Sequence, residues 1–195
     1  MSAIAFADPT FESQAAFRRI MRAMSAPGTM VDCGEALAPP PPLVRAAAAA
    51  LLTLADFETA LWIAPSFPVE VGEYLAFHSG APPAAAPDRA AFALVDLAAD
   101  SLDLARFAWG TAEYPDRSTT IVAQTSSLDA GRRLRLNGPG INGEAALAVS
   151  LLPGDFQVQW AANRAAFPRG VDLILVADAR LVALPRSIAI IDGAE

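Results

Sequence analysis

The segment Val171-Asp172-Leu173-Ile174-Leu175-Val176-Ala177 is the strongest strand prediction in the chain. Its residues are almost all aliphatic, as in a strand that is buried on both faces of a sheet. Asp178-Ala179-Arg180 follows as a tight turn, so the segment from Leu181 to Leu184 is expected to return antiparallel to the first strand. This hairpin is the feature on which the predicted fold is built.

Upstream of the hairpin, predicted strands alternate with predicted helices. Helices are expected from Pro9 to a stop at Pro27-Gly28, at 43–54, from Pro68 to the neighbourhood of Gly80, from an N-cap at Asp100 to Phe107, and at 153–166; strands are expected at 29–33, 61–63, 92–95, 119–124 and 133–136. Such alternation favours a parallel sheet that is covered on both faces, and the final hairpin adds an antiparallel pair. The sequence therefore predicts an α/β fold with three α/β/α layers around a mixed β-sheet, with residues 1–195 as one domain.

The composition indicates a protein that associates with other chains. Its 195 residues are 54% hydrophobic and only 18% charged, and the mean hydropathy is +0.36. A chain of this kind exposes apolar surface that a partner would cover, so we expect a large self- or hetero-association surface. The net charge of −7 argues against nucleic-acid binding, which favours a basic face.

The sequence shows no pattern of a membrane or export segment. No apolar run approaches the roughly 18 residues that span a bilayer, and the N-terminus lacks the pattern of a secretory signal. The single cysteine, Cys33, excludes an internal disulfide and fits a reducing compartment. We therefore expect no membrane partner and a cytoplasmic location.

The basic residues include no lysine, because all 14 are arginines. A Schiff-base lysine and a phosphate-loop lysine are therefore impossible in this chain. Any phosphate or phosphonate that binds must be held by arginine side chains or by backbone N–H groups.

The segment Gly138-Pro139-Gly140-Ile141-Asn142-Gly143 fits the pattern G-x-G-x-x-G. A dinucleotide-binding fingerprint would follow a buried parallel strand and carry an acidic residue about 20 residues later. Here the preceding strand, Arg133 to Leu136, alternates with arginine, and a helix-like segment stands where the acidic residue belongs. Two further interpretations stay open: a turn that needs positive φ angles, and a nest of loop amides that faces a phosphate or a partner.

Few other polar residues suggest chemistry. Asp56 and Glu58 would share one side of a strand, where paired carboxylates serve as acid and base or bind a metal. The alternative is structural, with Asp56 at the end of the helix loop and Glu58 paired with an arginine. The sole histidine, His78, is expected to cap a helix end, and Cys33 has no metal ligand beside it and is expected to be a small core residue.

Asp172 stands out because it opens a strand that is otherwise aliphatic. A carboxylate in that position needs a partner unless it lies at the solvent edge of the strand. Arg169 and Arg186 are the two candidates for that partner.

Six short motifs occur in order along the chain. They are Phe17-Arg18 with Met21, Met24 and Pro27-Gly28; Asp56-Phe57-Glu58-Thr59; Gly110-Thr111 with Tyr114-Pro115; Gly138-Pro139-Gly140-Ile141; Phe167-Pro168-Arg169-Gly170-Val171-Asp172-Leu173; and Leu184-Pro185-Arg186. In this combination the chain resembles the PhnH family, a subunit of the bacterial carbon–phosphorus lyase system. The resemblance covers nearly the whole chain.

The resemblance implies a fold related to the large domain of pyridoxal-phosphate-dependent transferases, without that cofactor or any other. It also implies a homodimer in isolation and sister subunits in a larger core complex. As the family is understood, the complex displaces adenine from a nucleoside triphosphate with an alkylphosphonate, and a later radical step cleaves the carbon–phosphorus bond of the ribose 1-phosphonate 5-triphosphate. The chain is then expected to be an accessory subunit with no catalytic residue of its own and no activity alone.

If this subunit contacts a ligand, the expected residues are Arg186, Gly138, Gly140, Asp56 and Glu58. Arg186 would hold two oxygens of a phosphate, phosphonate or nucleotide, the loop amides would add donors, and the carboxylates would orient them. No bound metal is expected. Two other functions stay open: a free-standing small-molecule hydrolase or transferase that uses Asp56 and Glu58, and a scaffold whose vestigial site binds nothing.

Overall fold

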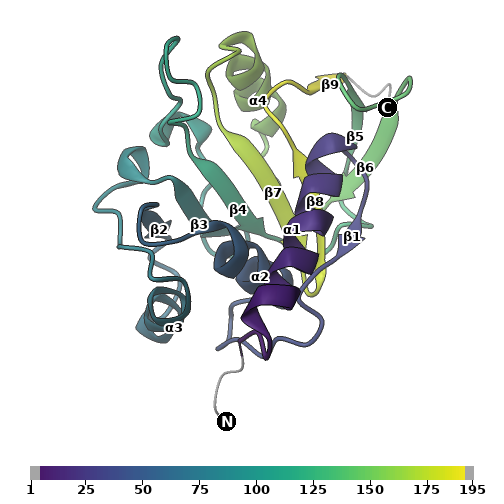
Figure 1. Ribbon diagram of the computed structural model, residues 1–195. Coiled ribbons are helices and arrows are strands. Elements are labelled where there is room, and N and C mark those ends of the chain that lie inside the picture. Colours follow the sequence, from purple (N-terminus) through teal and green to yellow (C-terminus); the bar gives the residue numbers. More distant parts are fainter. Residues whose placement is uncertain (1–4, 192–195) are drawn as a thin grey trace.

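A computed structural model describes residues 5–191 and places a six-stranded sheet at the centre of the molecule (Figure 1). The strand order across this sheet is β1-β8-β7-β4-β3-β2. Its strands are β1 (Val31–Asp32), β2 (Leu61–Ile63), β3 (Phe92–Asp96), β4 (Thr120–Gln124), β7 (Asp172–Ala177) and β8 (Arg180–Leu184). Strands β2, β3, β4 and β7 run parallel to one another. β8 pairs antiparallel with β7, and β1 in turn pairs antiparallel with β8. The predicted mixed sheet is therefore confirmed.

The hairpin predicted near the end of the chain is present as the antiparallel pair β7 and β8. Leu173 pairs with Leu184, and the register continues to Ala177 opposite Arg180. Asp178 forms the turn with φ 51°, a left-handed conformation that Asp tolerates better than most residues. β7 is aliphatic because it lies between two neighbouring strands and is covered on both faces, and all of its residues except Asp172 are buried.

Three helices cover one face of the sheet. They are α1 (Pro9–Ser25), α2 (Arg45–Leu54) and α3 (Val69–Ser79). Asp8 caps α1, since its side chain accepts a hydrogen bond from Phe11 N at 3.2 Å, and Pro9 occupies the first turn as expected. α2 is nearly all alanine and leucine, and its small buried side chains allow the helix to pack against Leu94, Val122 and Ile174 of the sheet.

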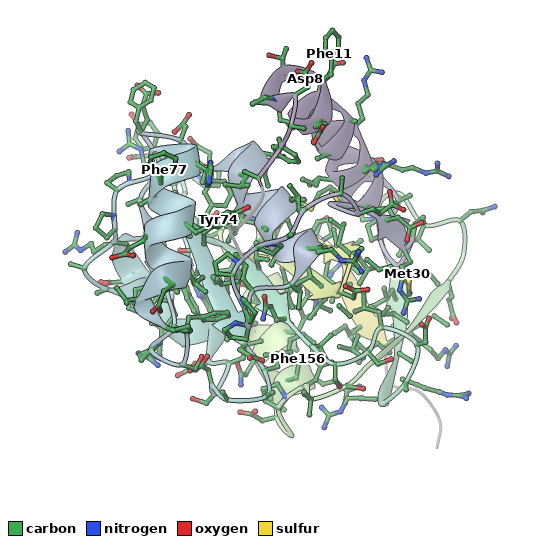
Figure 2. The ribbon with its side chains drawn as sticks, turned by 90° about the horizontal axis from the view of Figure 1, so that it is seen from below. Asp8, Phe11, Met30, Tyr74, Phe77 and Phe156 are labelled. Atoms are coloured by element: carbon green, nitrogen blue, oxygen red, sulfur yellow. The ribbon has the colours of Figure 1, made fainter. Side chains whose placement is uncertain are left out.

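The opposite face of the sheet is covered by α4 (Phe156–Ala165) and a second, smaller sheet. The small sheet has the order β6-β5-β9 and is antiparallel throughout; its strands are β5 (Arg132–Asn137), β6 (Ala145–Val149) and β9 (Ala189–Ile191). Figure 2 shows Phe156 of α4 on the far side of the sheet from Tyr74 and Phe11. The molecule thus has three layers, but one outer layer is helical and the other combines a helix with strands.

The prediction was wrong for the segment that follows Asp100. In place of a helix from Asp100 to Phe107, the structure has one 3-10 turn, η2 (Leu104–Arg106), which Asp103 caps through Ala105 N at 3.0 Å. Asp100 is not free to cap a helix there, because its carboxylate accepts hydrogen bonds from Ser66 Oγ and from Asp96 N. A second short turn, η1 (Pro87–Arg89), precedes β3.

Between residues 5 and 191, none of the helices is both long enough and apolar enough to cross a membrane.

Candidate functional site

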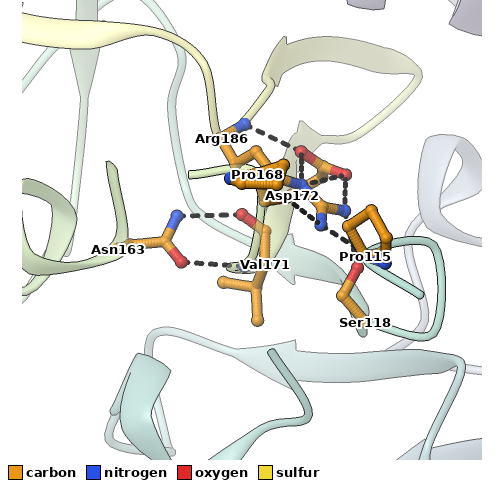
Figure 3. Close-up of polar contacts among 7 residues, drawn as sticks. All are labelled: Pro115, Ser118, Asn163, Pro168, Val171, Asp172 and Arg186. Atoms are coloured by element: carbon orange, nitrogen blue, oxygen red, sulfur yellow. Dashed lines mark hydrogen bonds and ion pairs between the residues drawn. The ribbon is translucent and has the colours of Figure 1, made fainter. Parts of the chain in front are cut away.

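Arg186 and Asp172 form a partly buried ion pair at the start of β7 (Figure 3). Arg186 Nε donates to Asp172 Oδ1 at 3.1 Å and to Oδ2 at 3.2 Å, Nη2 donates to Oδ2, and the backbone N–H of Arg186 donates to Oδ1 at 2.8 Å. Each of the two side chains is only 14% exposed. Of the two partners considered for Asp172, the structure selects Arg186 and leaves Arg169 exposed.

The remaining donors of the Arg186 guanidinium are also used within the protein. Nη1 donates to the carbonyl oxygens of Pro115 at 2.9 Å and Pro168 at 3.4 Å, and Nη2 donates to Ser118 Oγ at 2.6 Å. A guanidinium has five N–H groups, so each of them has a protein acceptor here. Arg186 therefore clamps several chain segments together, and a ligand would have to displace one of these acceptors.

The position of the clamp in the sheet also indicates a structural role. Asp172 is the first residue of β7 and pairs with Thr120, the first residue of β4. The clamp thus lies at the amino-terminal ends of these parallel strands. Ligands of open parallel sheets usually bind beyond the opposite, carboxyl-terminal ends.

Gly138 and Gly140 lie in the loop that joins β5 to β6. Their φ angles are 149° and 83°, which confirms the predicted turn with positive φ. The loop connects two antiparallel strands and opens no helix, so the arrangement excludes a dinucleotide fingerprint. A Cβ atom on Gly140 would collide with the carbonyl oxygen of Ser25, because the loop packs directly on the end of α1.

Asp56 and Glu58 lie in an exposed turn before β2 and are not on a strand. Asp56 Oδ1 accepts hydrogen bonds from Glu58 N at 2.9 Å and from Thr59 Oγ1 at 3.0 Å, while Thr59 Oγ1 in turn accepts from Asp56 N at 2.7 Å. The strand geometry assumed for a carboxylate pair is therefore wrong. The Asp56 carboxylate stabilises its own turn, a local use that Asp side chains commonly serve.

The structure brings only part of the predicted set together. Gly138 and Arg186 belong to adjacent segments, since a Cβ on Gly138 would lie 3.3 Å from Ser187 O and 2.9 Å from Ile188 Cδ1. The turn that holds Asp56 and Glu58 leads into β2, which is separated from β7 by β3 and β4. Three strand spacings of about 4.8 Å amount to roughly 14 Å, so these carboxylates do not share a site with Arg186.

Asn163 is a buried polar residue whose importance the sequence did not reveal. Its Nδ2 donates to Val171 O at 2.9 Å, and its Oδ1 accepts from Val171 N at 2.8 Å, so α4 is fastened to the chain just before β7 (Figure 3). A Cβ on Gly170 would lie 2.6 Å from Asn163 Oδ1. The only signal in the sequence is an asparagine on the apolar face of a predicted helix, which does not identify its partner.

The remaining candidates lack the surroundings of a reactive group. Cys33 is buried and belongs to the core beside the helices, as predicted, and burial raises the pKa of its thiol to about 11. His78 lies in the last turn of α3 and contacts the rings of Tyr74 and Phe77 edge-on, at 4.8 and 4.9 Å between centroids. Within residues 5–191, no group of three or more histidine, cysteine or carboxylate residues could hold a metal ion.

Comparison with known proteins gives the site its context. The chain is 42% identical to the alpha-D-ribose 1-methylphosphonate 5-triphosphate synthase subunit PhnH of Rhizobium meliloti (strain 1021) over 184 residues, 94% of this chain and 92% of that protein. It is 34% identical to the "Putative C-P lyase subunit protein HtxG" of Stutzerimonas stutzeri over 178 residues, 89% of this chain and 83% of that protein. Residues 4–191 match the family of bacterial phosphonate metabolism proteins called PhnH. The chain that carries the Arg186 clamp and the glycine loop between β5 and β6 therefore belongs to the PhnH family.

Proposed function

We propose that the chain is an accessory subunit of the carbon–phosphorus lyase core complex in organophosphonate catabolism. In this role it is needed when the complex forms ribose 1-alkylphosphonate 5-triphosphate from ATP and an alkylphosphonate. The observation that carries the proposal is the 42% identity, over 94% of the chain, to a protein named as a subunit of the corresponding synthase. Sister subunits of that complex are its proposed partners.

The proposal includes the absence of activity in the isolated chain and of any cofactor. The lack of lysine supports this, because a pyridoxal aldehyde has no side-chain amine in this chain with which to form a Schiff base. The engagement of Arg186 with protein acceptors and the local role of Asp56 support it as well. We propose that the catalytic groups of the reaction come from the sister subunits.

A fold related to the large domain of pyridoxal-phosphate-dependent transferases remains a proposal. It is supported by the parallel run β2-β3-β4-β7 with an antiparallel strand added beside β7. That residues 1–195 form one domain is supported by the six-stranded sheet, which lies between the two hydrophobic cores and contributes residues to each. A cytoplasmic location and a homodimer in isolation are proposed from the buried reduced thiol and from large apolar side chains that stay exposed, among them Phe11, Val158 and Phe167.

Direct ligand contact by Gly138, Gly140, Arg186, Asp56 or Glu58 stays a prediction. An anion could bind the backbone N–H groups of Gly138 and Gly140 without breaking an ion pair. To bind the same anion, Arg186 would first have to break hydrogen bonds to its protein acceptors. Phosphate, phosphonates and nucleotides are the ligands to test. A rise in melting temperature with one of these ligands would support contact, and no rise with any of them would support the scaffold that binds nothing.

The proposed function is tested by an assay of the purified chain with ATP and methylphosphonate, with and without the sister subunits. We expect the ribose phosphonate triphosphate to form only when all subunits are present, and to be lost when this chain alone is left out. The same dependence should appear as growth on methylphosphonate as the phosphorus source. Turnover by the isolated chain would overturn the proposal in favour of a free-standing hydrolase or transferase. Loss of that turnover in Asp56→Asn and Glu58→Gln variants would then identify its acid and base.

A further inference from the structure

A groove of about 400 Å³ runs between α3 and the outer edge of the edge strand β2. Figure 1 shows the two elements side by side at one end of the sheet. The lining is apolar and includes Ile63, Pro65, Val69 and Ala76. Among the described residues, the one charged side chain that lines the groove is Glu73.

The backbone of β2 is open where it borders this groove. Ala60 O accepts hydrogen bonds from the β3 side, and Ala64 N donates to Leu94 O at 2.9 Å, so the even-numbered residues of β2 face β3. Leu61 therefore faces outward, where its N–H and C=O pair with the segment 82–84. Ile63 is the next outward-facing residue, and within residues 5–191 no turn or loop hydrogen bond reaches it. An added strand would find a free donor and a free acceptor there.

A glycine in the middle of α3 keeps the groove open. Gly72 has no requirement for positive φ, and a Cβ atom on it would meet only Ile63 Cδ1, at the ordinary contact distance of 3.7 Å. Glycine inside a helix is unfavourable compared with alanine. Packing within the chain therefore does not explain why glycine stands at position 72. A partner's side chain that lies against the bare helix backbone there would explain it.

The outward face of α3 carries exposed apolar side chains beside its carboxylates and has no cover within the described residues. Val69 is 68% exposed, and Phe77 at the far end of the helix is 84% exposed. Figure 2 shows Phe77 pointing away from the body of the molecule, whereas Tyr74 of the same helix points toward α2. The face of α3 given by Val69, Gly72, Glu73 and Ala76 is thus available to a partner.

We propose that this groove binds an extended segment of another protein, which adds to β2 as a strand and places an apolar side chain over Gly72 and a basic side chain against Glu73. The charge decides between a foreign chain and a second copy. Two copies joined through the same groove would bring Glu73, and Glu70 beside it on α3, toward the same acidic residues of the other copy. A segment with arginine or lysine gains attraction at the same place.

The experiment uses the full chain and a defined probe, the peptide acetyl-Thr-Val-Thr-Val-Thr-Arg-Thr-amide, followed by backbone-amide NMR. We expect the Ile63 amide to shift and to exchange more slowly when the peptide is bound. A peptide with glutamate in place of arginine should bind up to about fivefold more weakly, and Glu73→Arg should invert the order of the two peptides.

Substitutions at Gly72 separate binding from folding. Gly72→Ala should raise the melting temperature of the chain and still weaken binding of the peptide. Gly72→Leu should weaken peptide binding by about tenfold or more, because the leucine side chain fills the groove. Ala161→Leu, on the exposed face of α4, is the matched control and should leave binding unchanged. Three outcomes would overturn the proposal. The Ile63 amide could fail to respond to the peptide, or wild type and Gly72→Leu could bind the peptide equally well. The third is an Ile63 amide that is protected from exchange in the isolated chain and loses this protection on dilution, as a second copy in the groove would give. Because the probe contains no sister subunit, these outcomes do not depend on the proposed function.

Discussion

Replacement of Arg186 by leucine is expected to destabilise the protein strongly, because the change leaves Asp172 almost without partners. The carboxylate would keep only the backbone N–H of residue 186, at 2.8 Å, and lose every bond from the guanidinium. Ser118 Oγ and the carbonyl oxygens of Pro115 and Pro168 would lose their donor as well.

The size of the loss follows from the burial of the pair. Removal of one partner from a buried ion pair costs about 3–5 kcal/mol, and the 14% exposure of both side chains places Arg186→Leu near the lower end. A loss of about 3 kcal/mol is a large share of the 5–15 kcal/mol that is typical for a domain. With a urea dependence of about 3 kcal/mol per molar, the midpoint of unfolding should fall by about 1 M.

The measurement is urea unfolding followed by far-ultraviolet circular dichroism. Arg169→Leu is the matched control, because Arg169 is exposed, and it should change the free energy of unfolding by less than about 0.5 kcal/mol. The double variant Asp172→Asn with Arg186→Leu should lose less than the sum of the two single variants. If Arg186→Leu unfolded at the wild-type urea concentration, the clamp would not stabilise the fold. If it also abolished growth on methylphosphonate, the ligand role of Arg186 would be supported instead.

Three further predictions test other parts of the structure. Gly140→Ala should lower the free energy of unfolding by at least about 2 kcal/mol more than Gly143→Ala, because both residues have positive φ but only Gly140 also abuts backbone; equal losses in urea unfolding would contradict the close packing of the loop on α1. Asn163→Leu should cost about 3 kcal/mol or more, since it leaves a buried N–H and a buried C=O without partners, and an unchanged melting temperature would refute this. Cys33 should resist thiol reagents at pH 8 until urea unfolds the chain, because burial raises its pKa to about 11. Its folded pKa lies above the unfolded value of 9.0, so wild type should lose about 2 kcal/mol of stability relative to Cys33→Ala as the pH rises from 9 to 11, and parallel pH profiles would contradict the burial of the thiol.

The sequence predicted the elements whose signals are local. The aliphatic run of β7, the turn at Asp178 and the Asp8-Pro9 start of α1 each carry their own chemistry, and all three are confirmed. β6 and β9 were not predicted. The alanines of β6 give no strong strand preference, and the three residues of β9 form a strand only because they pair with β5.

The candidate site shows a similar division. That Asp172 needs an arginine could be inferred from a carboxylate in an aliphatic strand, and the structure chose between the two candidates. That the guanidinium has no donor to spare could not be inferred, because its other acceptors lie at Pro115, Ser118 and Pro168. These residues contact Arg186 only in the folded chain, and nothing in the sequence around them indicates that contact.

The small sheet has a consequence for synthesis of the protein on the ribosome. Its central strand, β5, gains its second neighbour only from β9, and the indole of Trp160 donates at 2.8 Å to the carbonyl oxygen of Ile188 just before that strand. One edge of β5 must therefore stay unpaired until the residues of β9 have left the exit tunnel. During that interval the nascent chain presents an open strand edge to its neighbours, so its need for chaperones should be greatest between the emergence of β5 and that of β9.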